Sequence, residues 1–306
     1  MKGLELAKQY WEEIALPAIN AEFPELLDHA AFGLAGEGSE CFGFDDDISR
    51  DHDWGPGFCI WMTDEDHRCL GLRATALYQS LPSIFQGYQR LNQIQQTMDR
   101  TGVQTIGQFY ERLLGIDHPP QTEQDWFFLP EQGLAAATNG VVFLDRPHIF
   151  TQFRSVLLSH YPTDVCLKKL AAHCALAAQA GQYNYVRCQK RNDSVSSILA
   201  ASQFIEHVHS IVFLLNKAYK PYYKWSQKAM NSLPILGREL QPELEAIAES
   251  PMEQIDRIEA VSQIIISQLR LRGLSDHPSD FLLHHGEYIQ SQIKSPVLKQ
   301  LHLMAE

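Results

Sequence analysis

The sequence lacks the features of membrane and secreted proteins. It has no stretch of about 18 uncharged apolar residues, so we expect no membrane span. Its first residues are amphipathic and acidic and contain no continuous apolar run, which argues against a secretory signal. The six cysteines are scattered and none forms a CxxC pair. Such cysteine usage is typical of a reducing compartment, and we expect a cytoplasmic protein.

Several common site motifs are also absent. Residues 55–57 read Gly-Pro-Gly, but no strand–GxGxxG–helix frame surrounds them, so they predict a turn and no dinucleotide site. There is no P-loop and no nucleophile elbow of a Ser-His-Asp hydrolase. His207 and His209 lie two apart on an expected helix, face different directions and make a poor metal pair. The adjacent His284 and His285 are equally uninformative.

What is present is a long acidic chain with enough apolar residues for a core. It has 306 residues, 45% of them hydrophobic, and a net charge of −12. That length suffices for one large domain or two ordinary ones. The acidic balance argues against bulk electrostatic binding to long nucleic acids or anionic membranes.

The residue pattern changes near residue 150. Before it, helical periodicity at about 3–15 and 22–28 and from Asp64 onward alternates with strand-like runs. The expected strands are residues 29–36, 52–63, 124–129 and 140–145. After residue 150 the chain predicts only helices, the first of them ending at a Gly181 C-cap. We therefore predict an α+β protein with an N-terminal mixed-sheet domain (1–150) and a C-terminal helical bundle (151–306).

The opening of the expected second strand carries the clearest chemical pattern. Gly38-Ser39 follows the first expected strand, and Asp51-x-Asp53 comes eleven residues later. Residues two apart on a strand face the same side, with Cα atoms roughly 7 Å apart, so both carboxylates can reach one divalent ion. Backbone N–H groups and a hydroxyl after a strand can hold a phosphate. The order thus predicts a phosphate cradle beside a metal site.

This order resembles the nucleotidyltransferase fold of the DNA polymerase beta superfamily. The wider string, with Trp54-Gly55 after the pair, is similar to a bacterial family known as domain of unknown function 4037. The stretches at residues 125–145 and 183–194 resemble the same family, so the similarity would cover most of the chain.

The resemblance implies a metal-dependent transfer. Asp51 and Asp53 would hold Mg²⁺ or Mn²⁺, which binds a nucleoside triphosphate while an acceptor hydroxyl attacks its α-phosphate and pyrophosphate leaves. A third carboxylate belongs on a later strand, and the candidates are Asp125 and Glu131, with Asp125 preferred. The acceptor could be a small molecule, as in the two-domain aminoglycoside and lincosamide nucleotidyltransferases, or a hydroxyl of a protein or RNA.

A cationic segment at residues 216–225 offers nucleotide-binding candidates. On one continuing helix its lysines share a face and could neutralise phosphates, while a tyrosine stacks on the base. The candidates are Lys217, Lys220, Lys224, Tyr222 and Tyr223. Equally, the lysines could complement a helix C-terminus, since Pro221 interrupts the pattern.

Two further charged clusters can be explained without a binding site. Asp45, Asp46 and Asp47 form an acidic run that favours a solvated turn over a metal site. Arg187, with the basic residues at 190–191, could bind phosphate or make surface ion pairs.

Two alternatives to the transferase remain from the sequence. The first is a nucleotide-binding regulatory or antitoxin-like module without turnover, which a missing third carboxylate would favour. The second is a phosphohydrolase using the same carboxylates on water.

Overall fold

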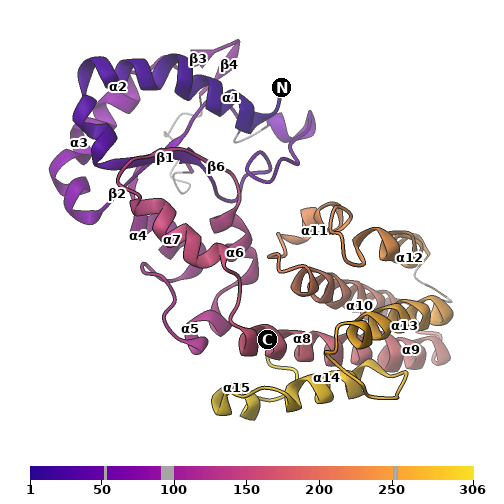
Figure 1. Ribbon diagram of the computed structural model, residues 1–306. Helices are drawn as coiled ribbons and strands as arrows, with labels where there is room; N and C mark the ends of the chain where they lie inside the picture. The colour runs from indigo at the N-terminus through magenta and orange to yellow at the C-terminus, as the bar shows by residue number, and fades with distance from the viewer. Residues whose placement is uncertain (52–53, 91–99, 251, 253) are drawn as a thin grey trace. The chain divides into compact units, whose positions relative to one another are not determined.

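The computed structural model describes residues 1–51, 54–90, 100–250, 252 and 254–306 (Figure 1). The chain divides into two compact units. Unit 1 comprises Met1–Pro120 and Leu129–Ser159, and unit 2 comprises Gln121–Phe128 and His160–Glu306. The predicted boundary at residue 150 differs from this division in two places. The helix at residues 149–158 belongs to unit 1, and the short helix at residues 123–128 belongs to unit 2.

Unit 1 contains a four-stranded mixed sheet in the order β5-β2-β1-β6. Its strands are β1 (Ala30–Leu34), β2 (Cys59–Met62), β5 (Gly102–Thr105) and β6 (Val141–Asp145). β1 runs antiparallel to both β2 and β6, and β5 runs parallel to β2. The mixed sheet confirms the α+β class expected from the sequence.

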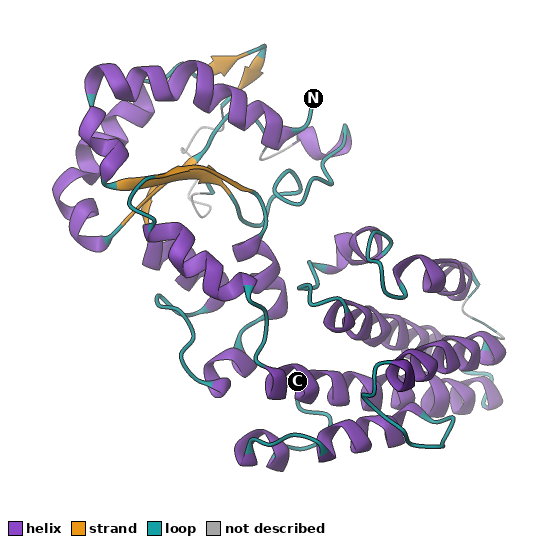
Figure 2. Ribbon diagram, in the orientation of Figure 1, coloured by secondary structure: helices purple, strands orange, loops and turns teal. Residues whose placement is uncertain are grey.

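Helices cover both faces of this sheet (Figure 2). The helices of unit 1 are α1 (Gly3–Tyr10), the π-helix η1 (Trp11–Ala15), α2 (Leu16–Glu22), the 3₁₀ helices η2 (Pro24–Asp28) and η3 (Ile48–Asp51), α3 (Asp64–Ser80), α4 (Ile106–Leu114), α6 (Glu131–Thr138) and α7 (Ile149–Leu158). A small hairpin joins β3 (Ile84–Phe85) to β4 (Tyr88–Gln89).

The alternation of side chains along β2 explains the two layers. Ile60 and Met62 lie in the core cluster that includes residues of α1 and α3. Trp61 points to the opposite face, where its ring stacks on that of Phe150 of α7, with the centroids 3.9 Å apart. It also meets the ring of Phe109 of α4 at a centroid distance of 5.3 Å. Successive strand residues face opposite sides, so a short strand buried on both faces needs apolar residues throughout.

The regular secondary structure of unit 2 is helical in its described residues, as the sequence predicts for the chain after residue 150. Its elements are α5 (Glu123–Phe128), α8 (Thr163–Ala177), the π-helix η4 (Ala178–Tyr185), α9 (Val186–Lys190), α10 (Ser194–Leu215), α11 (Tyr223–Met230), α12 (Gly237–Glu249), α13 (Ile255–Leu271), α14 (Leu282–Ser291) and α15 (Pro296–Gln300). α8 packs most extensively against α14 and α10.

The helix α10 is long and apolar enough to cross a membrane, even though it contains one acidic residue. However, 61% of its apolar window is buried inside the protein, as is usual for a core helix of a soluble fold. Its packing against α8 accounts for that apolar composition.

Three predictions of local structure are wrong. Residues 124–129 form helix α5 and not a strand, because Trp126 and Phe127 are buried in a helical turn that packs on α8. The second strand covers only Cys59–Met62 of the expected 52–63. Gly181 does not end its helix, since the chain continues through it as the π-helix η4.

Candidate functional site

The Gly-Ser turn follows β1 and is tied to the start of β6. Gly36 has φ +130, a conformation that favours glycine. The Asn139 side chain accepts from the Gly36 N–H at 2.9 Å and donates to its carbonyl at 2.6 Å. Gly140 N–H donates to the Cys41 carbonyl at 2.9 Å. These bonds hold the turn at the edge where β1 ends and β6 begins.

Two arginines lie against this turn. The Arg100 guanidinium pairs with Glu40 at 2.5 Å, and that of Arg112 pairs with Glu37 at 3.1 Å. A Cβ at Gly38 would overlap the side chains of Arg100 and Glu40. The ion pair between them therefore leaves room only for a glycine at this position. Burial raises the pKa of Glu40, although the Arg100 charge opposes the rise. Neither arginine can be linked to this turn from local sequence patterns, because each lies 60 or more positions from its partner.

The geometry of the Asp-x-Asp pair is only partly described. Asp51 is the last residue of the 3₁₀ helix η3, and its side chain lies outside the described part of the structure. Asp53 also lies outside the described residues. The prediction that the pair begins a strand is wrong for Asp51, because β2 starts at Cys59. The convergence of the two carboxylates therefore stays a prediction.

Asp45 contradicts the expectation of a solvated acidic turn. It is only 3% exposed, and its carboxylate accepts from the Gly3 N–H at 2.7 Å and the Trp54 indole N–H at 3.1 Å. Lys2 adds an ion pair at 3.5 Å. Burial by itself would raise the pKa of Asp45, but these donors outweigh it and leave the pKa below its ordinary value. Asp45 thus anchors the acidic segment to the first helix.

The candidates for a third carboxylate have other roles or positions. Asp125 belongs to helix α5 in unit 2, where its carboxylate accepts from the N–H groups of Gln121 and Thr122 at 2.9 and 2.8 Å. Glu131 begins α6 in unit 1. Asp145, at the end of β6, accepts from three N–H groups and one hydroxyl at the start of α7. Both aspartates therefore act as helix caps.

The cationic segment of unit 2 does not form one helix face. α10 ends at Leu215, because Lys217 adopts a positive φ of 50 before the next helix begins. Lys220 is buried and donates to Glu206 at 2.5 Å and to Ser210 at 2.6 Å. The prediction of three lysines on a single helix is therefore wrong, since the chain turns between them.

The other members of that segment are divided between two environments. Lys217 lines a cavity of about 310 Å³ in unit 2, together with Arg272 and His160. Tyr223 begins α11 and is 68% exposed, with its ring 4.3 Å from that of Tyr222. A cation in a largely apolar cavity suits an anionic group of a ligand.

The remaining basic candidates lie on and just after α9. The guanidinium of Arg187 stacks over the ring of Tyr183 at 4.2 Å. This cation–π contact is neither an ion pair nor a phosphate contact, so both interpretations of the cluster stay predictions.

Comparison with known proteins finds similarity to one protein family. Residues 126–226 match the model of a domain of unknown function, DUF4037. The matched range runs from α5 to α11 and contains most of the two later stretches on which the resemblance rests. Neither the curated proteins nor the solved structures returned a match. The match supports the resemblance to the DUF4037 family and does not extend to the Gly38-Ser39 turn.

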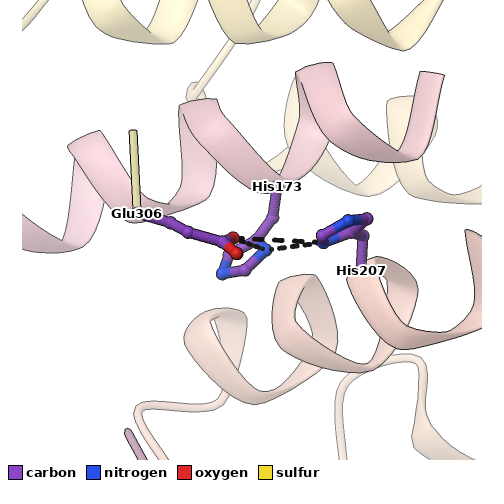
Figure 3. A group of neighbouring side chains, drawn as sticks. All are labelled: His173, His207 and Glu306. Carbon is purple, nitrogen blue, oxygen red and sulfur yellow. Dashed lines mark hydrogen bonds and ion pairs between the residues drawn. The ribbon is translucent and has the colours of Figure 1, made fainter. Parts of the chain in front are cut away.

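A histidine cluster in unit 2 was not predicted (Figure 3). His173 of α8 and His207 of α10 face each other with their Nδ1 atoms 3.2 Å apart. An oxygen of Glu306 lies 2.9 Å from the first of these nitrogens and 4.0 Å from the second. His209, by contrast, bonds Gln227 and Ser226, which confirms that it faces away from its neighbour at 207.

The charges of this cluster are shifted by its environment. Burial and the nearby His173 lower the pKa of His207 to about 4. Burial would raise the pKa of Glu306, but the hydrogen bond and charge of His173 outweigh it and bring the pKa to about 2. Local sequence patterns do not indicate this cluster, because its members lie on three segments that only the packing of α8, α10 and residues 301–306 brings together.

Proposed function

We propose that this protein is a magnesium-dependent nucleotidyltransferase. It would move a nucleoside monophosphate from a nucleoside triphosphate to an acceptor hydroxyl and release pyrophosphate. The observation that carries the proposal is the spacing of Gly38-Ser39 and Asp51-x-Asp53 within the connection between β1 and β2. These strands are antiparallel neighbours in the sheet, so the connection leaves and re-enters at one edge.

The donors in this connection suit the metal. Asp51 and Asp53 offer carboxylate oxygens, the hard ligands that Mg²⁺ and Mn²⁺ prefer. When bound, the ion would neutralise phosphate charge and orient the triphosphate. Gly38 and Ser39 would contact the phosphates through backbone N–H groups and the hydroxyl.

Arg100 and Arg112 support a phosphate at this turn. Both guanidinium groups already lie beside it, and each is paired with an acid of the same turn. Glu37 is 58% exposed and can give way to a phosphate, which would accept from the Arg112 guanidinium in its place. The turn would then exchange a carboxylate for a phosphate without moving the arginine.

The test is to incubate the protein with each α-labelled nucleoside triphosphate, Mg²⁺ or Mn²⁺, and candidate acceptors. We expect pyrophosphate release or transfer of label, lost in Asp51→Asn and Asp53→Asn. Asp47→Asn, which removes an exposed acid from the same segment, is the matched control and keeps activity. Transfer that survives in both asparagine variants contradicts the proposal.

One observation favours the second candidate, a nucleotide-binding regulatory module without turnover. Asp125, the preferred of the two candidates for the third carboxylate, instead accepts from backbone N–H groups at the start of α5. Calorimetric titration with each nucleotide separates the candidates. Magnesium-dependent binding without pyrophosphate release, whatever the acceptor, supports the module and contradicts the transferase.

A further inference from the structure

We propose that His173, His207 and Glu306 form a binding site in unit 2 for a divalent transition metal of the zinc class. The site is built from residues other than those of the proposed magnesium chemistry in unit 1. It therefore stands or falls independently of the proposed transferase.

The distances among the three ligand atoms carry the proposal. The two Nδ1 atoms and one carboxylate oxygen form a triangle with sides of 3.2, 2.9 and 4.0 Å (Figure 3). The circle through these atoms has a radius of about 2.0 Å, within the range of about 2.0–2.2 Å at which nitrogen and oxygen bind Zn²⁺. An ion at that distance lies close to the plane of the three atoms, and tetrahedral coordination needs side-chain movements that shorten the 4.0 Å separation and lengthen the 2.9 Å one.

The chemistry of the three ligands selects the class of metal. Two imidazole nitrogens and one carboxylate are a usual set for Zn²⁺ and related ions, and a poor one for Mg²⁺, which prefers oxygen. Three protein ligands leave a fourth position for water or another ligand, as catalytic zinc sites do.

Hydrogen bonding alone satisfies this cluster incompletely. An imidazole Nδ1 carries at most one proton, so His173 cannot donate fully to both the carboxylate and the facing Nδ1 of His207. Both histidines lie in partly or fully buried positions, where an incompletely paired polar atom is costly. A cation at the centre would accept a lone pair from all three atoms at once.

The surroundings hold the third ligand in place. The fully buried ammonium of Lys168 donates to the carbonyls of Leu303 at 2.8 Å and Ala305 at 2.9 Å. These bonds fix the backbone immediately before Glu306. The two histidines come from α8 and α10, which pack tightly against each other. The ligands are therefore pre-positioned on supported elements, which favours metal binding.

The neighbouring charges are compatible with a bound cation. Lys220, whose charge acts on His207, is paired with Glu206 at 2.5 Å. Its positive charge is thereby offset, and the carboxylate of Glu306 adds a negative charge at the cluster itself. With both histidines neutral, the cluster carries the single negative charge of Glu306, which attracts a divalent ion.

The experiment uses the full chain after removal of metal by chelation and dialysis. Zn²⁺ alone is titrated in competition with a chromophoric chelator, and Co²⁺ alone is followed by its visible absorption. We expect one equivalent bound and a Co²⁺ spectrum of low coordination number. His173→Ala, His207→Ala and Glu306→Gln each weaken binding by more than the roughly 10–100-fold typical of losing an outer-shell partner.

Two further variants make the result specific. His118→Ala removes an exposed histidine of unit 1 and should leave zinc affinity unchanged. Lys168→Met keeps all three ligands but releases the backbone before Glu306, and it should weaken binding by about 10–100-fold. The ultraviolet circular dichroism of each variant without metal checks that it folds.

A purely structural latch, in which Glu306 pairs with His173 without metal, is the competing outcome. It predicts a lower melting temperature for His173→Ala but no stoichiometric zinc binding and no Co²⁺ spectrum in the unmodified protein. That result overturns the proposal, as does zinc affinity that is unchanged in all three ligand variants.

Discussion

At the scale of single residues, Asp45 shows how a carboxylate in an acidic run can be structural. Its run of three acids predicts a solvated turn, yet its side chain is buried against Gly3 and Trp54. A buried charge is tolerated only when it is paired and hydrogen-bonded, which Lys2 and the two N–H donors provide. Its partner Gly3 lies 42 positions away, so the run itself holds no sign of this role.

The first prediction concerns the stability that Asp45 contributes. Asp45→Ala leaves the Gly3 N–H and the Trp54 indole without their acceptor, and we expect the free energy of unfolding to fall by roughly 2–4 kcal/mol. Chemical denaturation monitored by tryptophan fluorescence measures it. Asp47→Ala, at an exposed neighbour, should change stability by less than about 0.5 kcal/mol. Equal effects of the two substitutions contradict this role.

The second prediction concerns pH. The pKa of Asp45 is lowered in the folded protein, since its hydrogen bonds outweigh the burial that opposes them. Its contribution should therefore be fully present above the unfolded pKa, near 3.8, and be lost as pH falls through the lower folded pKa. The stability difference between the unmodified protein and Asp45→Asn should be constant above about pH 5 and shrink below about pH 4. If this stability difference instead grew as the pH falls, the pKa of Asp45 could not be lowered in the folded protein.

The third prediction concerns the Gly38-Ser39 turn. Glu37→Gln removes the charge that pairs with Arg112, so the guanidinium is more available to phosphate. If nucleotide binds there, its affinity should rise a few-fold in Glu37→Gln and fall about 10-fold in Arg112→Gln. Calorimetric titration with a nucleoside triphosphate and Mg²⁺ measures both.

The control for the turn is Arg146→Gln, which removes a half-exposed arginine paired with Asp28. It should leave nucleotide affinity unchanged. Identical affinities in all three variants would mean that the phosphates bind elsewhere.

At the scale of elements, Gly181 shows why a local stop signal failed. A glycine after an apolar periodic stretch predicts a helix end. In the structure the chain continues through Gly181 as a π-helix, and residues of neighbouring helices pack directly on this glycine. A Cβ there would lie 2.4 Å from the Phe204 ring and 2.8 Å from the Ile258 side chain. The glycine therefore allows neighbouring helices to pack closely and does not end the helix.

The fourth prediction follows from this contact. Gly181→Ala should lower the free energy of unfolding by about 1–3 kcal/mol, because the rings and side chains must shift to admit the methyl group. Gly107→Ala is the matched control in α4, where the added methyl meets its nearest neighbour at 3.4 Å. That substitution should be neutral or stabilising, since alanine favours helix more than glycine does. Stabilisation by Gly181→Ala would contradict this close packing, because it would mean that the methyl group fits without strain.

At the scale of the whole molecule, the chain passes between the two units more than once. Residues 121–128 belong to unit 2, residues 129–159 return to unit 1, and the rest of unit 2 follows. The helix α7 belongs to unit 1 because Phe150 stacks on Trp61 at 3.9 Å and Phe153 on Tyr110 at 3.7 Å. A composition change near residue 150 cannot show this exchange.

The fifth prediction tests this assignment with two fragments. The fragment 1–159 retains α7 and should show native-like near-ultraviolet circular dichroism and a cooperative thermal transition. The fragment 1–150 ends at the second residue of α7, so Trp61 keeps its contact with Phe109 of α4 but loses the cover of this helix, and we expect both signals to weaken. Equal cooperativity of the two fragments contradicts the place of α7 in unit 1.

The sequence by itself determined the α+β class, the strands β1 and β6, and the helical second half, because these depend on local periodicity and apolar runs. It also contained the Gly-Ser and Asp-x-Asp spacing on which the proposed function rests. For residues 124–129 local pattern was ambiguous, since a short apolar run suits a strand or a buried helical turn equally.

Only the tertiary structure decided which distant side chains meet. Arg100 and Arg112 reach the Gly38 turn across 60 or more residues, and Glu306 reaches His173 across more than a hundred. Lys220 is buried against Glu206 and not presented on a helix face. Local patterns specify helices and strands, whereas such contacts depend on how those elements pack, which the periodicity of any one segment does not contain.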